Sequence, residues 1–125
     1  MTGPAHLTDG LRVDHVLWRR LSGSHHYVGS LSAVDGSVRL EGEDPSSCIE
    51  VSLVIPFAEI ERVRVSGTPD EHVARERCVV VELVDADPIL LAEAGSGPHR
   101  LRRLARTLAG IVAISNGVRA TSEVM

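Results

Sequence analysis

The chain has 125 residues, 43% of them apolar and 24% charged, and a net charge of −4 at neutral pH. This composition predicts one folded domain with a single core, ordered over about residues 11–116 between a flexible N-terminal segment and a C-terminal tail. The acidic balance and the single tryptophan, tyrosine and phenylalanine argue against nucleic-acid binding, which needs basic surface and several stacking rings. No apolar run reaches the ~18 residues of a transmembrane helix, and the N-terminus lacks a signal-peptide pattern, so we expect a cytoplasmic protein.

The first patterned segment, residues 12–21, is ambiguous. Its apolar residues fall at a spacing that fits one face of a helix. However, Val13, Val16 and Trp18 are also good strand formers. Periodicity therefore leaves helix and strand both open here.

A hairpin is expected next. Residues 27–34 and 37–42 flank Asp35-Gly36, a dipeptide that tolerates the positive φ angles of a type I′ turn. Residues 45–47, Pro-Ser-Ser, then predict a loop.

Four more strands are predicted in the second half of the chain. The first begins at Cys48 and alternates strictly, which is typical of a strand with one buried face. That face is expected to hold Ile49, Val51, Leu53 and Ile55. The other strands are expected over residues 60–66, 78–84 and 89–92, with a charged loop over residues 67–76. Cys48 and Cys78, at strand starts among apolar neighbours, are expected to be buried thiols.

The last element is expected to be an amphipathic helix. Ser96 or Gly97 can cap it, Pro98 suits its first turn, and Asn116-Gly117 is a C-terminal stop signal, with a frayed tail beyond. Its apolar stripe consists of Leu101, Leu104, Ala105, Leu108, Ile111 and Val112.

If residues 12–21 form a strand, seven strands precede one helix. That order resembles the pleckstrin-homology-like (PH-like) and GRAM-like domains of bacteria, as do the passage Ile-Pro-Phe-x-x-Ile-x-x-Val at residues 55–63 and Leu-x-x-Leu-Ala in the helix. The resemblance covers about residues 12–115. It implies a mainly β (α+β) fold: a seven-stranded, partly open antiparallel barrel of two sheets, capped by a C-terminal helix. Phosphoinositide-binding members carry a basic-x-Arg pair in the second strand, where this chain has Tyr27-Val28-Gly29.

One candidate binding site is a local cationic loop in an otherwise acidic chain. Residues 15–34 contain no acidic residue and include Arg19, Arg20, His25 and His26. Arginine forks and loop amides of this kind can hold a phosphate or a carboxylate. The alternative is a solvated hairpin connection whose arginines pair with nearby carboxylates. Adjacent histidines on a strand point to opposite faces, so no metal site or cofactor is expected.

A second candidate is the arginine-rich side of the helix. Arg102, Arg103 and Arg106 lie opposite the apolar stripe and could dock an acidic partner or a bilayer surface. The alternative is a solvated face whose arginines pair with Glu59, Glu61 or Glu93.

The leading functional hypothesis is a non-enzymatic interaction module. The sequence has neither a Gly-x-Ser-x-Gly motif nor a glycine-rich phosphate loop, so we do not expect an enzyme. An open sheet edge can accept a strand from a protein partner or from a second copy, giving a homo-oligomer. The alternative function is binding of an anionic lipid headgroup or a small anion through the loop after the first strand.

Overall fold

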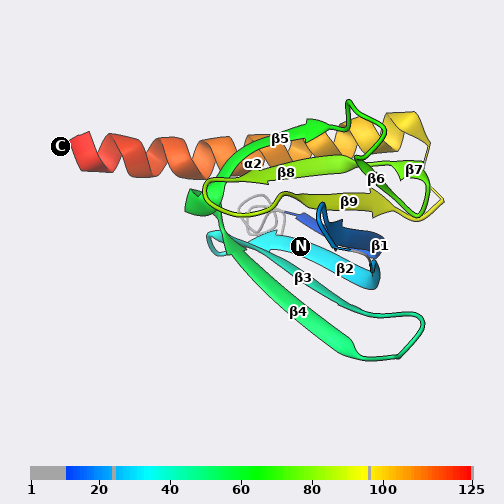
Figure 1. Cartoon of the computed structure of the whole chain (residues 1–125). Coiled ribbons are helices and arrows are strands. Elements are labelled where there is room, and N and C mark those ends of the chain that lie inside the picture. Colours follow the sequence, from blue (N-terminus) through cyan, green and yellow to red (C-terminus); the bar gives the residue numbers. More distant parts are fainter. Residues whose placement is uncertain (1–10, 24, 96, 125) are drawn as a thin grey trace, which may run out of the picture.

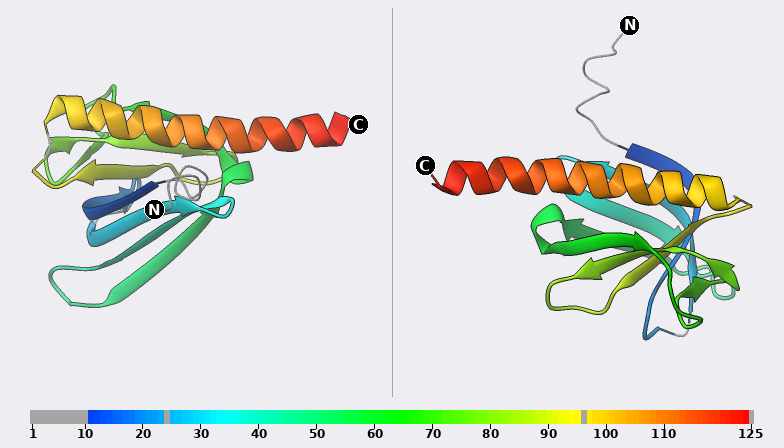
Figure 2. Two further views of the ribbon diagram at one scale, coloured as in Figure 1. Left: turned by 180° about the vertical axis from the view of Figure 1, so that it is seen from behind. Right: turned by 90° about the horizontal axis from the view of Figure 1, so that it is seen from above.

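The computed structural model describes residues 11–23, 25–95 and 97–124, with side chains as far as residue 116. The predicted flexible N-terminal segment lies outside these residues. The chain is mainly β, with a seven-stranded antiparallel sheet, a small two-stranded sheet and one C-terminal helix (Figures 1 and 2). The elements are β1 (Leu11–Arg20), β2 (Tyr27–Val34), β3 (Ser37–Glu43), β4 (Glu50–Pro56), the 3₁₀ turn η1 (Phe57–Glu59), β5 (Ile60–Val65), β6 (His72–Val73), β7 (Glu76–Arg77), β8 (Val79–Leu83), β9 (Ile89–Glu93) and α2 (Pro98–Val124).

The ambiguous first segment is a strand. β1 pairs with β2 on one side and with β9 on the other, so its main-chain groups are used in two ladders at once. The register shifts between Asp14 and Val16, and His15 at the shift has a φ of 59°. This bulge explains the misleading periodicity, because an extra residue puts Val13 and Val16 on one face although they are three positions apart.

All seven long strands join in the order β4-β3-β2-β1-β9-β8-β5. The predicted hairpin is confirmed: β2 and β3 pair from Val28↔Glu43 to Val34↔Ser37, and Asp35 and Gly36 turn the chain with φ of 55° and 80°. β4 and β5 end the order, so they are the two edges of the sheet. In Figure 1, β4 lies on the side of the molecule away from α2.

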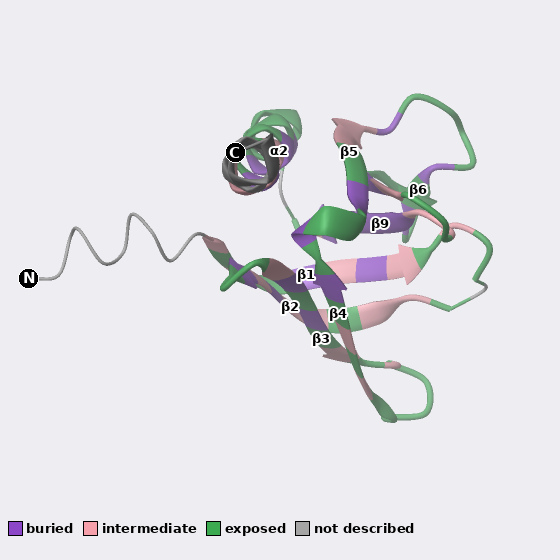
Figure 3. Cartoon of the chain, turned by 90° about the vertical axis from the view of Figure 1, so that its left-hand side faces the viewer, coloured by how far each residue is buried: buried purple, intermediate pink, exposed green. Residues whose placement is uncertain are grey.

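α2 covers β5, β8 and η1 with the predicted apolar stripe. Leu101, Leu104, Ala105, Leu108 and Val112 are buried, and Ile111 is half-buried. The core lies between this helix and the inner face of the sheet, to which β1, β2, β3 and β8 contribute buried side chains (Figure 3).

The predicted helix stop was wrong. α2 runs through Asn116-Gly117 to Val124. The side chain of Asn116 does not cap the helix; its Nδ2 donates a hydrogen bond to the carbonyl of Phe57 at 3.1 Å. A glycine inside a helix costs about 1 kcal/mol, which a helix of 27 residues can absorb.

The start of the alternating strand was also predicted wrongly. β4 begins at Glu50, and Cys48 lies in the connection before it with a φ of 61°. Its side chain is exposed, so the expected burial of this thiol was wrong. Ile49, expected on the buried face, is 63% exposed. Burial along that face increases toward Ile55, because the β3–β4 turn extends beyond the part of the sheet that α2 covers (Figure 3).

The segment predicted as a loop, residues 67–76, includes β6 and the first residue of β7, which pair as a short hairpin. Val73 of β6 is fully buried and packs with Cys78, Val80, Leu90 and Ala92 in a second apolar cluster on the outer face of β8 and β9. The charged composition of this segment gave no indication that one of its residues, Val73, is buried. Cys78 is buried as expected, and burial raises the pKa of its thiol to about 11.

Candidate functional site

The structure separates the four residues of the predicted cationic loop. Arg19 and Arg20 are neighbours on β1, and successive residues of a strand face opposite sides of a sheet. Arg20 lies on the inner face with Trp18, whereas Arg19 reaches the β6 side of the sheet. One anion therefore does not receive both arginines.

Arg19 is engaged by the main chain. Its guanidinium donates to the carbonyls of Arg20, Leu21 and Gly23 at 3.1, 3.0 and 3.2 Å. It also donates to the carbonyls of Asp70 and His72, at 3.0 and 2.9 Å. These bonds join the β1–β2 loop to the start of β6 and to the loop before it. Arg19 therefore acts as a clamp and has little donor capacity left for a ligand.

Arg20 instead lines a cleft on the inner face, which we call the aromatic cleft. It has a volume of about 310 Å³. Its lining residues come from β1, the β1–β2 loop, β2 and β4: Trp18, Arg20, Gly23, His25, Tyr27, Val51, Ser52 and Leu53. The ring centroids of Trp18 and Tyr27 are 4.7 Å apart, with a tilt of 41°. Two aromatic rings and two aliphatic side chains thus form an apolar surface next to a guanidinium and an imidazole.

Two facing glycines shape the strands beside this cleft. Gly29 of β2 is opposite Gly42 of β3. A Cβ on Gly29 would lie 1.8 Å from the carbonyl oxygen of Glu41, and a Cβ on Gly42 would lie 3.1 Å from Nε1 of Trp18. That indole nitrogen donates to the carbonyl of Glu41 at 3.4 Å. The indole takes this position because position 42 has no side chain.

The two predicted histidines also differ. His25 lies at the cleft, and its Nδ1 is 3.7 Å from a carboxylate oxygen of Asp44. Asp44 accepts hydrogen bonds from the amide and hydroxyl of Ser46, and these bonds, more than His25, hold the pKa of its carboxyl below the usual value. His26 is half-buried and does not line the cleft. Of the four predicted residues, the cleft therefore brings together Arg20 and His25.

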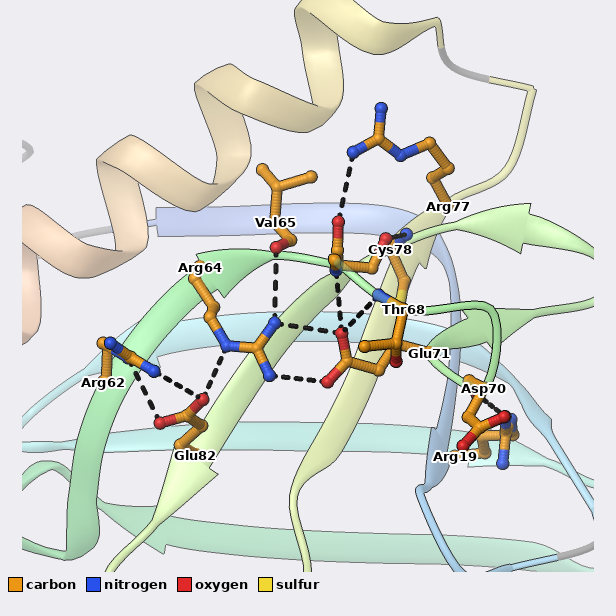
Figure 4. Close-up of polar contacts among 12 residues, drawn as sticks. Arg19, Arg62, Arg64, Val65, Thr68, Asp70, Glu71, Arg77, Cys78 and Glu82 are labelled. Carbon is orange, nitrogen blue, oxygen red and sulfur yellow. Dashed lines mark hydrogen bonds and ion pairs between the residues drawn. The ribbon is translucent and has the colours of Figure 1, made fainter.

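A charged cluster that sequence reasoning missed lies on β5, on β8 and in the loop between β5 and β6; we call it the Arg64 cluster (Figure 4). Arg64 donates to both oxygens of Glu71 at 3.0 and 2.5 Å and to Glu82 at 2.6 Å. Arg62 makes a second, two-point contact with Glu82 at 3.2 and 3.1 Å. The carboxylate of Glu71 also accepts the amides of Gly67 and Thr68. The cluster is satisfied internally and holds the loop against the sheet.

The predicted docking face on the helix is exposed. Arg102, Arg103 and Arg106 are exposed, and no ion pair is recorded for them among the side chains that the structure describes. A neighbouring arginine of the helix, Arg100, pairs with one of the carboxylates named above: its Nη1 lies 3.7 Å from Glu93. Whether this face docks a partner stays a prediction.

Sequence reasoning missed the apolar part of the cleft for a clear reason. In the sequence, Trp18 indicates only a strand and Tyr27 only the start of the hairpin, and nothing in a strand pattern tells which residues of different strands will meet. The Arg64 cluster did leave a signal: Glu82 interrupts an otherwise apolar strand, and Arg62 and Arg64 alternate on one face of another.

Two general properties of the described residues bear on function. In the parts of the chain that the structure describes, no group of three or more His, Cys, Asp or Glu side chains is arranged to hold a metal ion. None of the described helices combines the length and the apolar content that crossing a bilayer requires.

Comparison of the chain with protein-family models, with curated proteins and with solved structures found no significant match.

Proposed function

We propose that this chain is a non-enzymatic interaction module that binds an extended protein segment as an added strand on β4. The observation that carries the proposal is that β4, which among the described residues pairs with a strand on one side only, also helps to line the aromatic cleft. The strand order and the C-terminal helix also support a PH-like, partly open barrel as the scaffold. A scaffold of this kind recognises its partner through a sheet edge and its pockets.

The hydrogen-bond pattern defines which groups of β4 are free. The amide of Asp44 donates to the carbonyl of Ile49, and that of Phe57 to the carbonyl of Gly36. In an antiparallel ladder with these bonds, Val51, Leu53 and Ile55 direct their amides and carbonyls toward β3. The alternate residues Glu50, Ser52 and Val54 direct theirs outward. The outward position of Pro56, which has no N–H, ends the row.

The middle of the β4 edge lacks the usual protection against strand addition, which is confined to its two end residues, Glu50 and Pro56. Natural edges are blocked by charges, prolines or bulges, but Val51–Ile55 contains no charged residue, no proline and no register shift. Val54 is 50% exposed. Such an uncharged, β-branched edge is a ready template for another strand.

Amide hydrogen exchange tests the proposal directly. The probes are the chain itself, over a dilution series, and a synthetic peptide of alternating threonine and valine. We expect one of them to slow exchange at the outward amides of Ser52 and Val54 more than at the inward amide of Leu53. Protection that rises with chain concentration identifies a second copy, and protection that rises with peptide identifies a foreign segment.

Val54→Lys provides the blocking variant, because a lysine on an edge disfavours strand addition. Val28→Lys is the matched control: Val28 is 37% exposed, but β2 lies inside the sheet. The lysine at position 54 should remove the protection and the lysine at position 28 should not. Exchange at Ser52 and Val54 that ignores both concentration and peptide would refute the proposal.

A further inference from the structure

We propose that the aromatic cleft is the specificity pocket for the segment added to β4, and that it selects an apolar side chain with a carboxylate two positions away. The inference rests on the proposed function. It commits to a foreign acidic segment as the occupant rather than a second copy of this chain.

The position of the cleft makes strand addition and side-chain capture compatible. Val51 and Leu53 of β4 form one wall of the cleft, and both lie on the inner face. Side chains directly opposite each other on neighbouring strands are about 5 Å apart, so alternate side chains of an added strand contact these two residues. The next side chain on the same face follows about 6.6 Å further along. Two successive inner-face side chains of the segment therefore meet the cleft and its rim.

The size of the cleft indicates one side chain. Its volume of about 310 Å³ is at the lower limit of ligand pockets, roughly 300–1,000 Å³. An engineered apolar cavity of about 150 Å³ binds benzene. The cleft thus accepts a leucine, methionine or phenylalanine side chain with space for a polar group at its rim. Trp18, which is only 2% exposed, and the half-buried Tyr27 contribute aromatic surface to the floor of the cleft, which favours contact with such a side chain.

The charge at the rim indicates a carboxylate. Arg20 is exposed, and no ion pair or side-chain hydrogen bond is recorded for its guanidinium among the residues the structure describes. The imidazole of His25 is a second nitrogen-bearing group beside this guanidinium, and none of the described residues that line the cleft is acidic. Asp44, which pairs with His25, is engaged in the turn through Ser46. An arginine with unused donors pairs best with a carboxylate, which accepts two of its N–H groups.

A second copy is a poorer complement. Antiparallel pairing of two β4 edges keeps the same face of both strands on the same side. The copy would then present Val51, Leu53 and Ile55 to the cleft region and no carboxylate to Arg20. A foreign segment with an apolar residue followed by an aspartate or glutamate at the second position satisfies both requirements.

Trp18 is the single tryptophan of the chain and lies in the cleft, so its fluorescence reports directly on occupancy. The probes are two capped peptides of alternating threonine and valine with a central phenylalanine; one carries aspartate and the other asparagine two positions after it. Isothermal titration gives the affinities. We expect the aspartate peptide to shift the Trp18 emission and to bind about three- to tenfold more tightly than the asparagine peptide.

A double-mutant cycle between Arg20 and the aspartate of the peptide tests whether these two groups interact. Arg20→Gln should lose the same three- to tenfold with the aspartate peptide and nothing with the asparagine peptide. Arg39→Gln, which removes an exposed arginine from the outer face of β3, is the matched control and should change neither affinity.

Each of the other possible outcomes would refute a different part of the proposal. Binding that Val54→Lys abolishes, but that is indifferent to Arg20 and to aspartate, retains strand addition and overturns the pocket. Binding that depends on Arg20 but not on position 54 overturns strand addition and with it the inference. Arg20-dependent binding to phosphatidylserine vesicles without peptide binding overturns both in favour of a lipid headgroup.

Discussion

Glu71 provides the most quantitative prediction, because its carboxylate is nearly buried and holds a loop through several bonds. Its side chain is 9% exposed and pairs with Arg64, which is 31% exposed. Hydrogen bonds from Arg64 first, and then from the amide of Gly67, lower the pKa of this carboxyl from 4.5 to about 2. At about 1.36 kcal/mol per pH unit, that difference gives a ceiling of ~3.4 kcal/mol. Because water partly screens Arg64, we expect Glu71→Gln to lower the free energy of unfolding by about 2 kcal/mol at pH 7.

The pH dependence has a definite sign. Folding depresses this pKa, so the stabilisation is complete above about pH 4.5 and is lost as the pH falls toward about 2. With those two pKa values, roughly 1.4 kcal/mol of the ceiling disappears between pH 7 and pH 3.5. Urea unfolding of the wild type and of Glu71→Gln at both pH values measures this. The difference between them should shrink by about two fifths at pH 3.5.

The control is Glu61→Gln, which changes an exposed glutamate on the same edge strand as Arg64. It should alter stability by less than about 0.5 kcal/mol at either pH. A Glu71→Gln effect as small as that of Glu61→Gln, or one that is the same at pH 7 and pH 3.5, would refute the reasoning.

Three further predictions concern packing, the loop clamp and the thiols. Gly29→Ala places a Cβ 1.8 Å from a carbonyl oxygen of the next strand and should lower the free energy of unfolding in urea by at least about 2 kcal/mol. The control is Gly67→Ala, whose Cβ meets nothing within 4 Å and which should lower it little. Equal effects of the two substitutions would contradict the close approach at Gly29. Arg19→Gln removes most of the donors that join the β1–β2 loop to the loop before β6. It should lower the free energy of unfolding by about 1–2 kcal/mol and make amide hydrogen exchange faster in both loops. Exchange as slow as in the wild type would show that the clamp is dispensable. Ellman's reagent at pH 7 should modify Cys48 at once and Cys78, whose pKa is raised to about 11, only on unfolding; two promptly reacting thiols would exclude the buried position.

Several elements of this fold were predicted from interactions between residues that are close in the sequence. Asp35-Gly36 predicted the β2–β3 turn because few residues tolerate two consecutive positive φ angles. The 3.6-residue periodicity of the apolar stripe predicted which side of α2 packs on the sheet. Both signals lie within a few residues of the structure they specify. The helix stop at Asn116 failed because the side chain found a partner in η1, distant in the sequence.

The cleft could not be predicted in the same way. Trp18, Tyr27 and Leu53 come from three strands, and their meeting depends on strand order, on register and on the bulge at His15. Arg19 and Arg20 have different surroundings because the two faces of β1 lie against different parts of the chain: Arg20 lines the cleft, and Arg19 contacts β6 and the loop before it.

The sequence by itself determined the class of fold, the helix face and the hairpin, because hydrophobic periodicity and turn chemistry act between residues that are close in the chain. The tertiary structure alone decided which strands became the edges of the sheet and which of Arg19 and Arg20 lies at the aromatic cleft. Those properties depend on contacts between segments far apart in the sequence. A shift of the strand register by a single residue would move every side chain of a strand to the opposite face of the sheet.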